Sequence, residues 1–222
     1  SGVSSYPPKA LGRPALGCML IKNSEILSNS LRWGSSSLGP RAQFKPILSG
    51  FNKKNIESSD SAKLLLASKK KATISNIRNI TPWLYETPVA PTIAAKLEKK
   101  KISYQSLKSW CLTKKQSSNS RFILFEGAGG IMVPIDKHKT FIDLFEDLSF
   151  PVVLIVGSYL GTISHTLSAL ENLNKRNIKT INIVLNEGIK SGKKIFSQNL
   201  ELLISTINDK TKIRTLSTNP GA

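Results

Sequence analysis

The sequence predicts an α/β protein in which a parallel sheet is covered by helices on both faces. Three short apolar segments have the length and composition of buried parallel strands, and each is followed by a glycine or a polar residue. Segments with helical spacing separate them, as the crossovers of a parallel sheet require. The predicted strands cover 122–125, 151–156 and 178–185. A chain of 222 residues is long enough to form one good core.

Charge and composition narrow the classes of partner. The formal net charge is +18, but the lysines are scattered rather than interleaved with aromatic residues, so we expect a solvated basic surface that attracts anionic substrates and no nucleic-acid partner. The apolar run Phe150–Val156 is too short to cross a bilayer, and no membrane association is expected. Cys18 and Cys111 have no metal-ligand or disulfide spacing, and the first thirty residues lack a secretory apolar segment. These features predict a reducing, cytoplasmic location.

Residues 1–43 differ from the rest of the chain. They contain nine Ser, five Gly and four Pro with a single acidic residue, and three Arg against two Lys, whereas four Arg accompany 23 Lys from residue 44 onward. Leu16–Ile21 has the character of a short strand, and 33–40 that of a loop. We therefore predict an atypical segment over 1–43, non-native or disordered, and one α/β domain over 44–222.

The elements of the larger segment follow from local signals. Phe44–Gly50 is predicted to end a strand and enter a loop, because Pro46 cannot donate to a ladder. Helices are predicted where caps, an early proline or apolar spacing indicate them. Two X-Pro steps, at Pro82 and Pro88, enclose an aromatic loop. The predicted helices run over 58–69, 91–99, 103–116, 140–148, 161–175 and 195–207.

A glycine-rich turn, Glu126–Gly130, follows the first buried strand. Gly127, Gly129 and Gly130 would let backbone N–H groups converge into a concavity for anionic oxygens. Glu126 could hold a hard cation such as Mg²⁺. The alternative is a tight turn beside a solvated glutamate, and this segment alone does not decide between the two.

Residues 44–220 contain an ordered set of short landmarks. The landmarks are Lys45-Pro46, Ser49-Gly50, Ser59-Asp60, Glu86-Thr87-Pro88, Ala90-Pro91, Glu126–Gly130, Val133-Pro134, Thr140–Leu144, Pro151–Gly161 with His165, Leu185-Asn186 and Ile213–Pro220. Each landmark is weak alone, but their ordered set is specific and resembles that of dethiobiotin synthetase.

The resemblance implies a P-loop-type fold, a homodimer and a cyclo-ligase of biotin biosynthesis. Such an enzyme joins CO2 to 7,8-diaminopelargonate with ATP and Mg²⁺, through a carbamate and a carbamic-phosphoric anhydride. By that resemblance Lys45 would neutralise the carbamate and the γ-phosphate, and Ser49 would bind the substrate. Asp60 and Glu126 would hold Mg²⁺. The implied nucleotide-binding residues are Asp60, Glu126, Gly127, Ala128, Gly129, Asn186, Ile213, Arg214 and Asn219.

The start of the predicted helix at 161–175 forms a separate carboxylate site. Free N–H groups and the positive dipole end of a helix attract a carboxylate without a basic side chain. The resemblance assigns the substrate carboxylate of the neighbouring subunit to this place, with Ser164 standing where an asparagine is expected. The residues concerned are Gly161, Thr162, Ile163 and Ser164.

Plainer structural roles compete at several of these residues. Lys45 could be one exposed lysine among 25, and Asp60 could cap a helix. Asn186 could be a turn residue after a buried strand. His138 and His165 have no partner spacing, and core or surface roles are favoured for both. Gly192-Lys193 lacks the earlier glycine that a phosphate loop needs.

The resemblance is incomplete at one motif. No G-x-x-x-x-G-K-[ST] occurs in these 222 residues, and although Lys22 has about the expected distance from Lys45, apolar residues and Asn23 surround it. Three explanations compete: a frameshifted or mis-joined segment 1–43, a Ser-rich targeting leader, and a degenerate homologue. Impaired activity, an inactive nucleotide- or partner-binding homologue, and a related amidating or partitioning ATPase all remain open.

Overall fold

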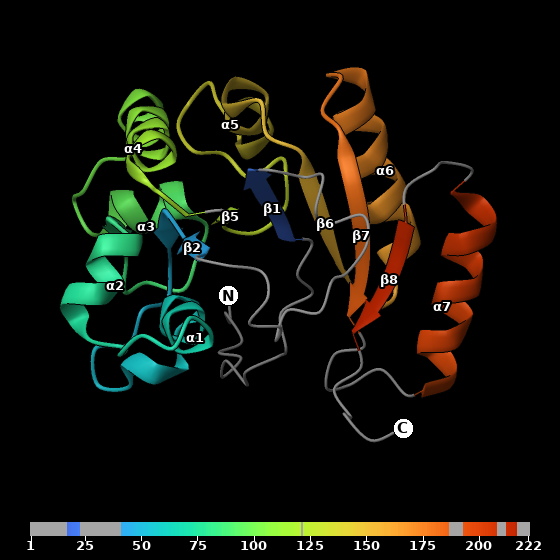
Figure 1. Cartoon of the computed structure of the whole chain (residues 1–222), viewed down its shortest axis with the longest axis horizontal. Helices are drawn as coiled ribbons and strands as arrows, with labels where there is room; N and C mark the ends of the chain where they lie inside the picture. Colours follow the sequence, from blue (N-terminus) through green and yellow to red (C-terminus); the bar gives the residue numbers. More distant parts are fainter. Residues whose placement is uncertain (1–16, 23–40, 121, 187–192, 208–211, 217–222) are drawn as a thin grey trace, which may run out of the picture.

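A six-stranded sheet organises the molecule in the computed structural model, which describes residues 17–22, 41–120, 122–186, 193–207 and 212–216 (Figure 1). The strand order is β2-β5-β1-β6-β7-β8, and a small two-stranded sheet pairs β3 with β4. The strands are β1 (Gly17–Lys22), β2 (Arg41–Phe44), β3 (Ile47–Leu48), β4 (Trp83–Leu84), β5 (Phe122–Glu126), β6 (Val152–Gly157), β7 (Thr180–Asn186) and β8 (Lys212–Leu216).

The sheet is parallel except at its centre. Strand β1 runs antiparallel to both neighbours, with Met19 opposite Glu126 and Lys22 opposite Ile123. The α/β class is confirmed, but the expectation of an all-parallel sheet is corrected at this strand. A short apolar segment indicates a buried strand but does not indicate the strand's direction. The antiparallel pairing of β1 could therefore not be predicted from its residues.

Alternation along the strands divides the core into two clusters. Ile123 and Phe125 of β5 join the larger cluster, and so do buried side chains from all seven helices. Phe122, Leu124, Val153 and Val184 form a smaller cluster, which by the period-two alternation lies on the opposite face. We expected helices on both faces. Among the described residues, the helices pack into the larger cluster and only strand residues make up the smaller one.

Local signals account for the helices, and the expected helices form within a few residues of their predicted bounds. Side chains of Ser59, Thr73 and Ser103 cap three of the helices that form, and a capping box begins another at Thr140. Helix α2, strand β8 and the β3–β4 pair were not predicted. Within the described residues, none of the helices combines the length and apolar character that crossing a membrane needs. The helices are α1 (Asp60–Ala67), α2 (Ile74–Ile80), α3 (Pro91–Leu97), α4 (Tyr104–Ser117), α5 (Phe141–Leu148), α6 (Thr162–Lys175) and α7 (Lys193–Thr206).

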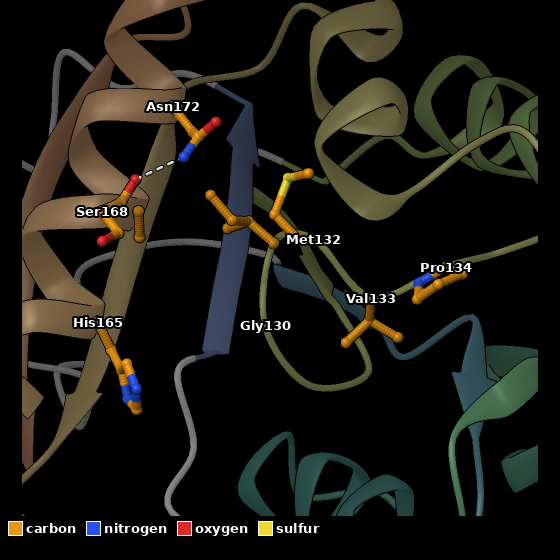
Figure 2. A pocket seen from close by; sticks show the side chains of 9 residues that line it. Gly130, Met132, Val133, Pro134, His165, Ser168 and Asn172 are labelled. Atoms are coloured by element: carbon orange, nitrogen blue, oxygen red, sulfur yellow. Dashed lines mark hydrogen bonds between the residues drawn. The ribbon is translucent and has the colours of Figure 1, made fainter. Parts of the chain in front are cut away.

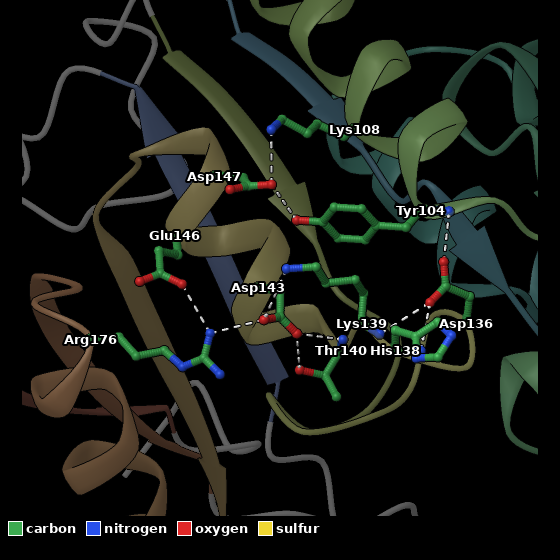
Figure 3. A network of polar contacts seen from close by, with 10 residues as sticks. All are labelled: Tyr104, Lys108, Asp136, His138, Lys139, Thr140, Asp143, Glu146, Asp147 and Arg176. Carbon is green, nitrogen blue, oxygen red and sulfur yellow. Dashed lines mark hydrogen bonds and ion pairs between the residues drawn. The ribbon is translucent and has the colours of Figure 1, made fainter.

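A polar network joins α4, α5 and the end of α6 beside the loop that follows the glycine-rich turn (Figure 3). The buried Tyr104 hydroxyl donates to Asp147 at 2.6 Å. Asp143 accepts from the Thr140 N–H at 2.7 Å and from Arg176 Nη1 at 2.9 Å. The Asp143 carboxylate therefore ties the start of α5 to the end of α6.

Asp143 makes the stability of this network depend on pH. Desolvation raises its pKa, but hydrogen bonds from Thr140 and Arg176 outweigh this and lower the pKa from 3.8 to about 2. Because the pKa is depressed in the folded state, the stabilisation is complete above about pH 4 and is lost as the pH falls toward 2.

We expect Asp143→Asn to lower the free energy of unfolding at pH 7 by roughly 2 kcal/mol. Denaturant unfolding between pH 7 and pH 3 should show the difference from the unchanged protein shrinking as acid is added. The matched control is Glu171→Gln, which removes an exposed ion pair on α6 and should change stability little. A difference that stays constant with pH would contradict this explanation.

Candidate functional site

Lys45 is a buried cation at the carboxyl end of β2. Its side chain is 5% exposed, and its Nζ donates to Glu126 Oε1 at 2.6 Å and to the Gly127 carbonyl at 3.2 Å. Asp60 Oδ2 lies 3.5 Å from the same Nζ. The alternative of an ordinary exposed lysine is therefore wrong. The two carboxylates compensate the positive charge of the Lys45 ammonium group, and this compensation allows the group to be buried.

The register of the sheet explains why Lys45 meets Glu126. Strands β2 and β5 are parallel neighbours, and Phe44 lies opposite Phe125. Lys45 and Glu126 follow these two residues, so both leave the sheet at the same edge. The rings of Phe44 and Phe125, the residues that precede Lys45 and Glu126, stack with their centroids 5.2 Å apart. The sequence-based expectation that these two side chains face each other is confirmed, while a shared site and their chemical roles stay predictions.

Asp60 is the first residue of α1, and its side chain is 41% exposed. Ser59, not Asp60, supplies the cap, because its side chain accepts from the Ala62 N–H at 3.2 Å. The carboxylate of Asp60 is thus available to face Lys45 and Glu126. The capping role is therefore excluded for Asp60, and its part in holding a metal ion stays a prediction.

The donor set is suitable for Mg²⁺ in the presence of a nucleotide. Two carboxylates converge on one point, and Mg²⁺ in nucleotide-dependent enzymes is held by one or two carboxylates together with phosphates and water. A cluster of three or more His, Cys, Asp or Glu side chains is absent from the described part of the chain. Asp60 and Glu126 would therefore hold the ion only in combination with oxygens from the substrate.

The glycine-rich turn has a backbone that only glycine tolerates at one position. Gly129 has φ +85°, and a Cβ there would lie 3.0 Å from Val133 Cγ2. Gly127 is buried, and its carbonyl accepts a hydrogen bond from Lys45, a contact that no sequence pattern predicts. Ala128 packs against the larger core cluster, so its contribution to a nucleotide site would come from its backbone.

Ser49 lies in the loop after β3, on the same chain segment as Lys45. Its hydroxyl oxygen is buried and has no hydrogen-bond partner in the structure. A buried hydroxyl without a partner costs free energy unless a ligand or water satisfies it. This geometry supports the predicted substrate contact.

The predicted carboxylate site lies at the start of α6, beyond β6. Gly161 has φ +95° and forms the N-cap, while the fully exposed Leu160 precedes it. Both hydrogen-bond donors of Thr162 have partners within the protein: its hydroxyl donates to the Gly157 carbonyl and its N–H to the Tyr159 carbonyl. The side chain of Ser164 is exposed. His165 is exposed as well, and one of its ring nitrogens contacts the Tyr159 hydroxyl at 2.9 Å.

An open groove of about 430 Å³ connects the region of the glycine-rich turn with α6 (Figure 2). Its walls are mostly apolar, and Figure 2 shows Met132 and Val133 on the loop side facing His165 and Asn172 on α6. The residues that line it are Gly130, Ile131, Met132, Val133, Pro134, His165, Ser168, Ala169 and Asn172. Such a groove is suited to an aliphatic chain.

The predicted adenine residues lie farther along the sheet. Asn186 ends β7, and its carbonyl accepts from the Ser158 N–H at 3.0 Å. Ile213 and Arg214 belong to β8, where Ile213 packs against the larger core cluster. Strands β1 and β6 separate these residues from β5. Asn219 lies outside the described residues.

Lys22 does not join the site. It pairs with Ile123 at the amino end of β5, whereas Glu126 is at the carboxyl end of the same strand. The antiparallel direction of β1 therefore places Lys22 at the opposite edge of the sheet.

Comparisons with known proteins show the family to which this chain belongs. A family model described as an AAA domain matches residues 37–218. The ATP-dependent dethiobiotin synthetase BioD of Phenylobacterium zucineum is 33% identical over 86% of this chain and 78% of its own length. That of Caulobacter vibrioides is 35% identical over 81% and 76%, and that of Acidiphilium cryptum 36% over 75% and 74%. The chain therefore belongs to the family of ATP-dependent dethiobiotin synthetases.

Proposed function

We propose that this protein is an ATP-dependent ligase that closes the ureido ring of dethiobiotin from 7,8-diaminopelargonate and CO2. The observation that carries the proposal is the buried Lys45 ammonium held between Glu126 and Asp60 at the carboxyl edge of the sheet. A cation and two carboxylates at one place are the groups that phosphoryl transfer to a carbamate requires.

The proposed sequence of steps uses residues in separate roles. One substrate amine adds to CO2 and gives a carbamate, whose negative charge lies near Lys45. A carbamate oxygen then takes the γ-phosphoryl group of ATP and releases ADP. The second amine attacks the carbonyl carbon, expels phosphate and closes the ring. Lys45 stabilises the charge that develops at the transferred phosphoryl group, and Ser49 Oγ binds the substrate.

Mg²⁺, when bound, would neutralise charge on the β- and γ-phosphates. Asp60 and Glu126 would hold it, and Lys45 would turn from Glu126 toward the carbamate and phosphate oxygens. The backbone of Glu126–Gly129 would line the nucleotide, with Asn186, Ile213, Arg214 and Asn219 near the adenine. We further propose a homodimer in which the start of α6 receives the substrate carboxylate of the neighbouring subunit.

The decisive measurement is ADP release in a coupled assay. We expect release that depends on both diaminopelargonate and bicarbonate. Release with glutamine but not with diaminopelargonate would favour a different ATPase of this fold. A parallel preparation, in which a conventional strand and phosphate loop replace β1 and run parallel to β5 so that the loop emerges beside Lys45, shows whether the Lys45 site works once that motif is supplied. Inactivity of both proteins would contradict the proposal.

A second candidate is a non-catalytic nucleotide- or partner-binding homologue. It is favoured by one specific observation: the 222 residues contain no phosphate-loop motif, and Lys22 lies at the edge of the sheet opposite Glu126. Calorimetry with ATP and diaminopelargonate separates the two candidates, because the second predicts binding of ligand without formation of product.

A further inference from the structure

We infer that Glu98 is a positioning residue that holds the Ser49–Gly50 loop in place for the substrate. Glu98 follows α3 and lies outside the Lys45 site. Its Oε1 accepts from the N–H groups of Glu86 and Thr87 at 2.7 and 2.9 Å, and from the Thr87 hydroxyl at 3.1 Å. The substrate role of the loop rests on the proposed function, whereas the mechanical link does not.

A second contact strengthens the hold on the same segment. Lys100 Nζ donates to Glu98 Oε2 at 2.8 Å and to the Leu84 carbonyl at 3.2 Å. The Glu98 side chain is only 16% exposed. Burial raises the pKa of Glu98, but its hydrogen bonds from Lys100, Thr87 and Glu86 outweigh burial and lower the pKa to about 2. The carboxylate is therefore charged at neutral pH, which strengthens each bond that it accepts.

Residues 84–87, which Glu98 and Lys100 bind on one side, form backbone hydrogen bonds on their other side with the loop that contains Ser49. Thr87 O accepts from the Gly50 N–H at 3.1 Å, and Tyr85 O accepts from the Phe51 N–H at 2.9 Å. The Tyr85 N–H donates to Leu48 O at 2.8 Å in register with the β3–β4 pair. Residues 48–51 are thus attached to 85–87 by three backbone bonds, and Ser49 lies between two of the attached residues.

The loop around Ser49 has little structure of its own that would hold it in place. Gly50 has φ +76°, and because glycine is the residue least restricted in φ, its own backbone preference does not hold the turn after Ser49 in place. Strands β3 and β4 have only two residues each, so the paired segment is too short to be stable alone. A charged acceptor that fixes Glu86 and Thr87 therefore determines where the buried Ser49 hydroxyl is presented.

The test compares the unchanged protein with Glu98→Gln, which keeps an acceptor oxygen without the charge, and Glu98→Ala, which removes the acceptor. Glu201→Gln on the exposed side of α7 is the matched control. The first readout is amide hydrogen exchange by NMR. We expect at least about tenfold faster exchange at Thr87 and Gly50 in Glu98→Ala, an intermediate effect in Glu98→Gln, and no change at Leu154 in the core.

Calorimetry supplies the second readout. We expect Glu98→Gln to weaken diaminopelargonate binding about tenfold while ATP binding stays within about twofold, because Ser49 rather than the phosphate site is displaced. A uniform increase of exchange that includes Leu154 would mean a general loss of stability and would overturn the positioning role. Unchanged exchange at Gly50 in both variants would overturn it too.

The proposed function and this inference fail in different ways. Faster exchange at Gly50, combined with no diaminopelargonate binding by the unchanged protein, would contradict the ligase proposal and leave the mechanical link intact. Normal diaminopelargonate binding in every Glu98 variant of a functional enzyme would contradict the positioning role alone.

Discussion

Lys45→Ala should lower the turnover of diaminopelargonate roughly a thousandfold, because it removes the only described buried cation beside Glu126 at the place where negative charge develops. Folding should be less affected. The carboxylates left behind are 25% and 41% exposed, so water can solvate them once the ammonium is gone.

Steady-state ADP release checks this result, and Lys175→Ala is the control. Lys175 is 70% exposed on α6 and forms only a surface ion pair with Glu171. The control should keep its activity. If Lys45→Ala and Lys175→Ala turned over at similar rates, the site at the carboxyl edge of β2 would not be where the chemistry takes place.

Glu126→Gln has the larger effect on stability. The substitution removes the negative charge nearest to the buried Lys45 ammonium. Asp60, which lies farther from the ammonium than Glu126 does, and the Gly127 carbonyl remain as its partners. We expect a loss of about 2 kcal/mol in the free energy of unfolding at pH 7, less than for a completely unpaired buried charge because these partners remain. Turnover should also fall about a hundredfold, since a predicted Mg²⁺ ligand is lost.

A double variant isolates the cause. Replacing Lys45 with methionine in the Glu126→Gln background removes the buried cation and fills its space with an apolar chain of similar length. Denaturant unfolding should then show stability restored toward that of the unchanged protein, although turnover stays at least as low as in Glu126→Gln. If the double variant were as unstable as Glu126→Gln alone, the stability effect would have to come from something other than the unpaired ammonium.

The contact between Lys45 and Glu126 could be predicted from the sequence, because it follows directly from the parallel arrangement of the strands. Lys45 follows one apolar strand and Glu126 ends another, and parallel strands bring their carboxyl ends to one edge, so the sequence alone predicts that the two side chains lie close together. Most helices were predictable as well, because caps such as Ser59 and Ser103 are visible in the sequence.

Other features depend on information that local patterns do not contain. The direction of β1 is set by its neighbours and not by its own apolar residues. Strands β3 and β4 have two residues each, too few to show any period. The role of Glu98 could not be predicted from the sequence, because two of its partners are backbone N–H groups 11 and 12 positions away, which every residue type except proline can supply.

The reversed central strand sets a practical condition for protein engineering. A nucleotide cradle grafted after residue 22 would emerge beside the start of β5 and point away from Glu126. Supplying that motif productively therefore means re-threading the middle of the sheet, so that the polypeptide enters from the other side and the new loop emerges over Lys45.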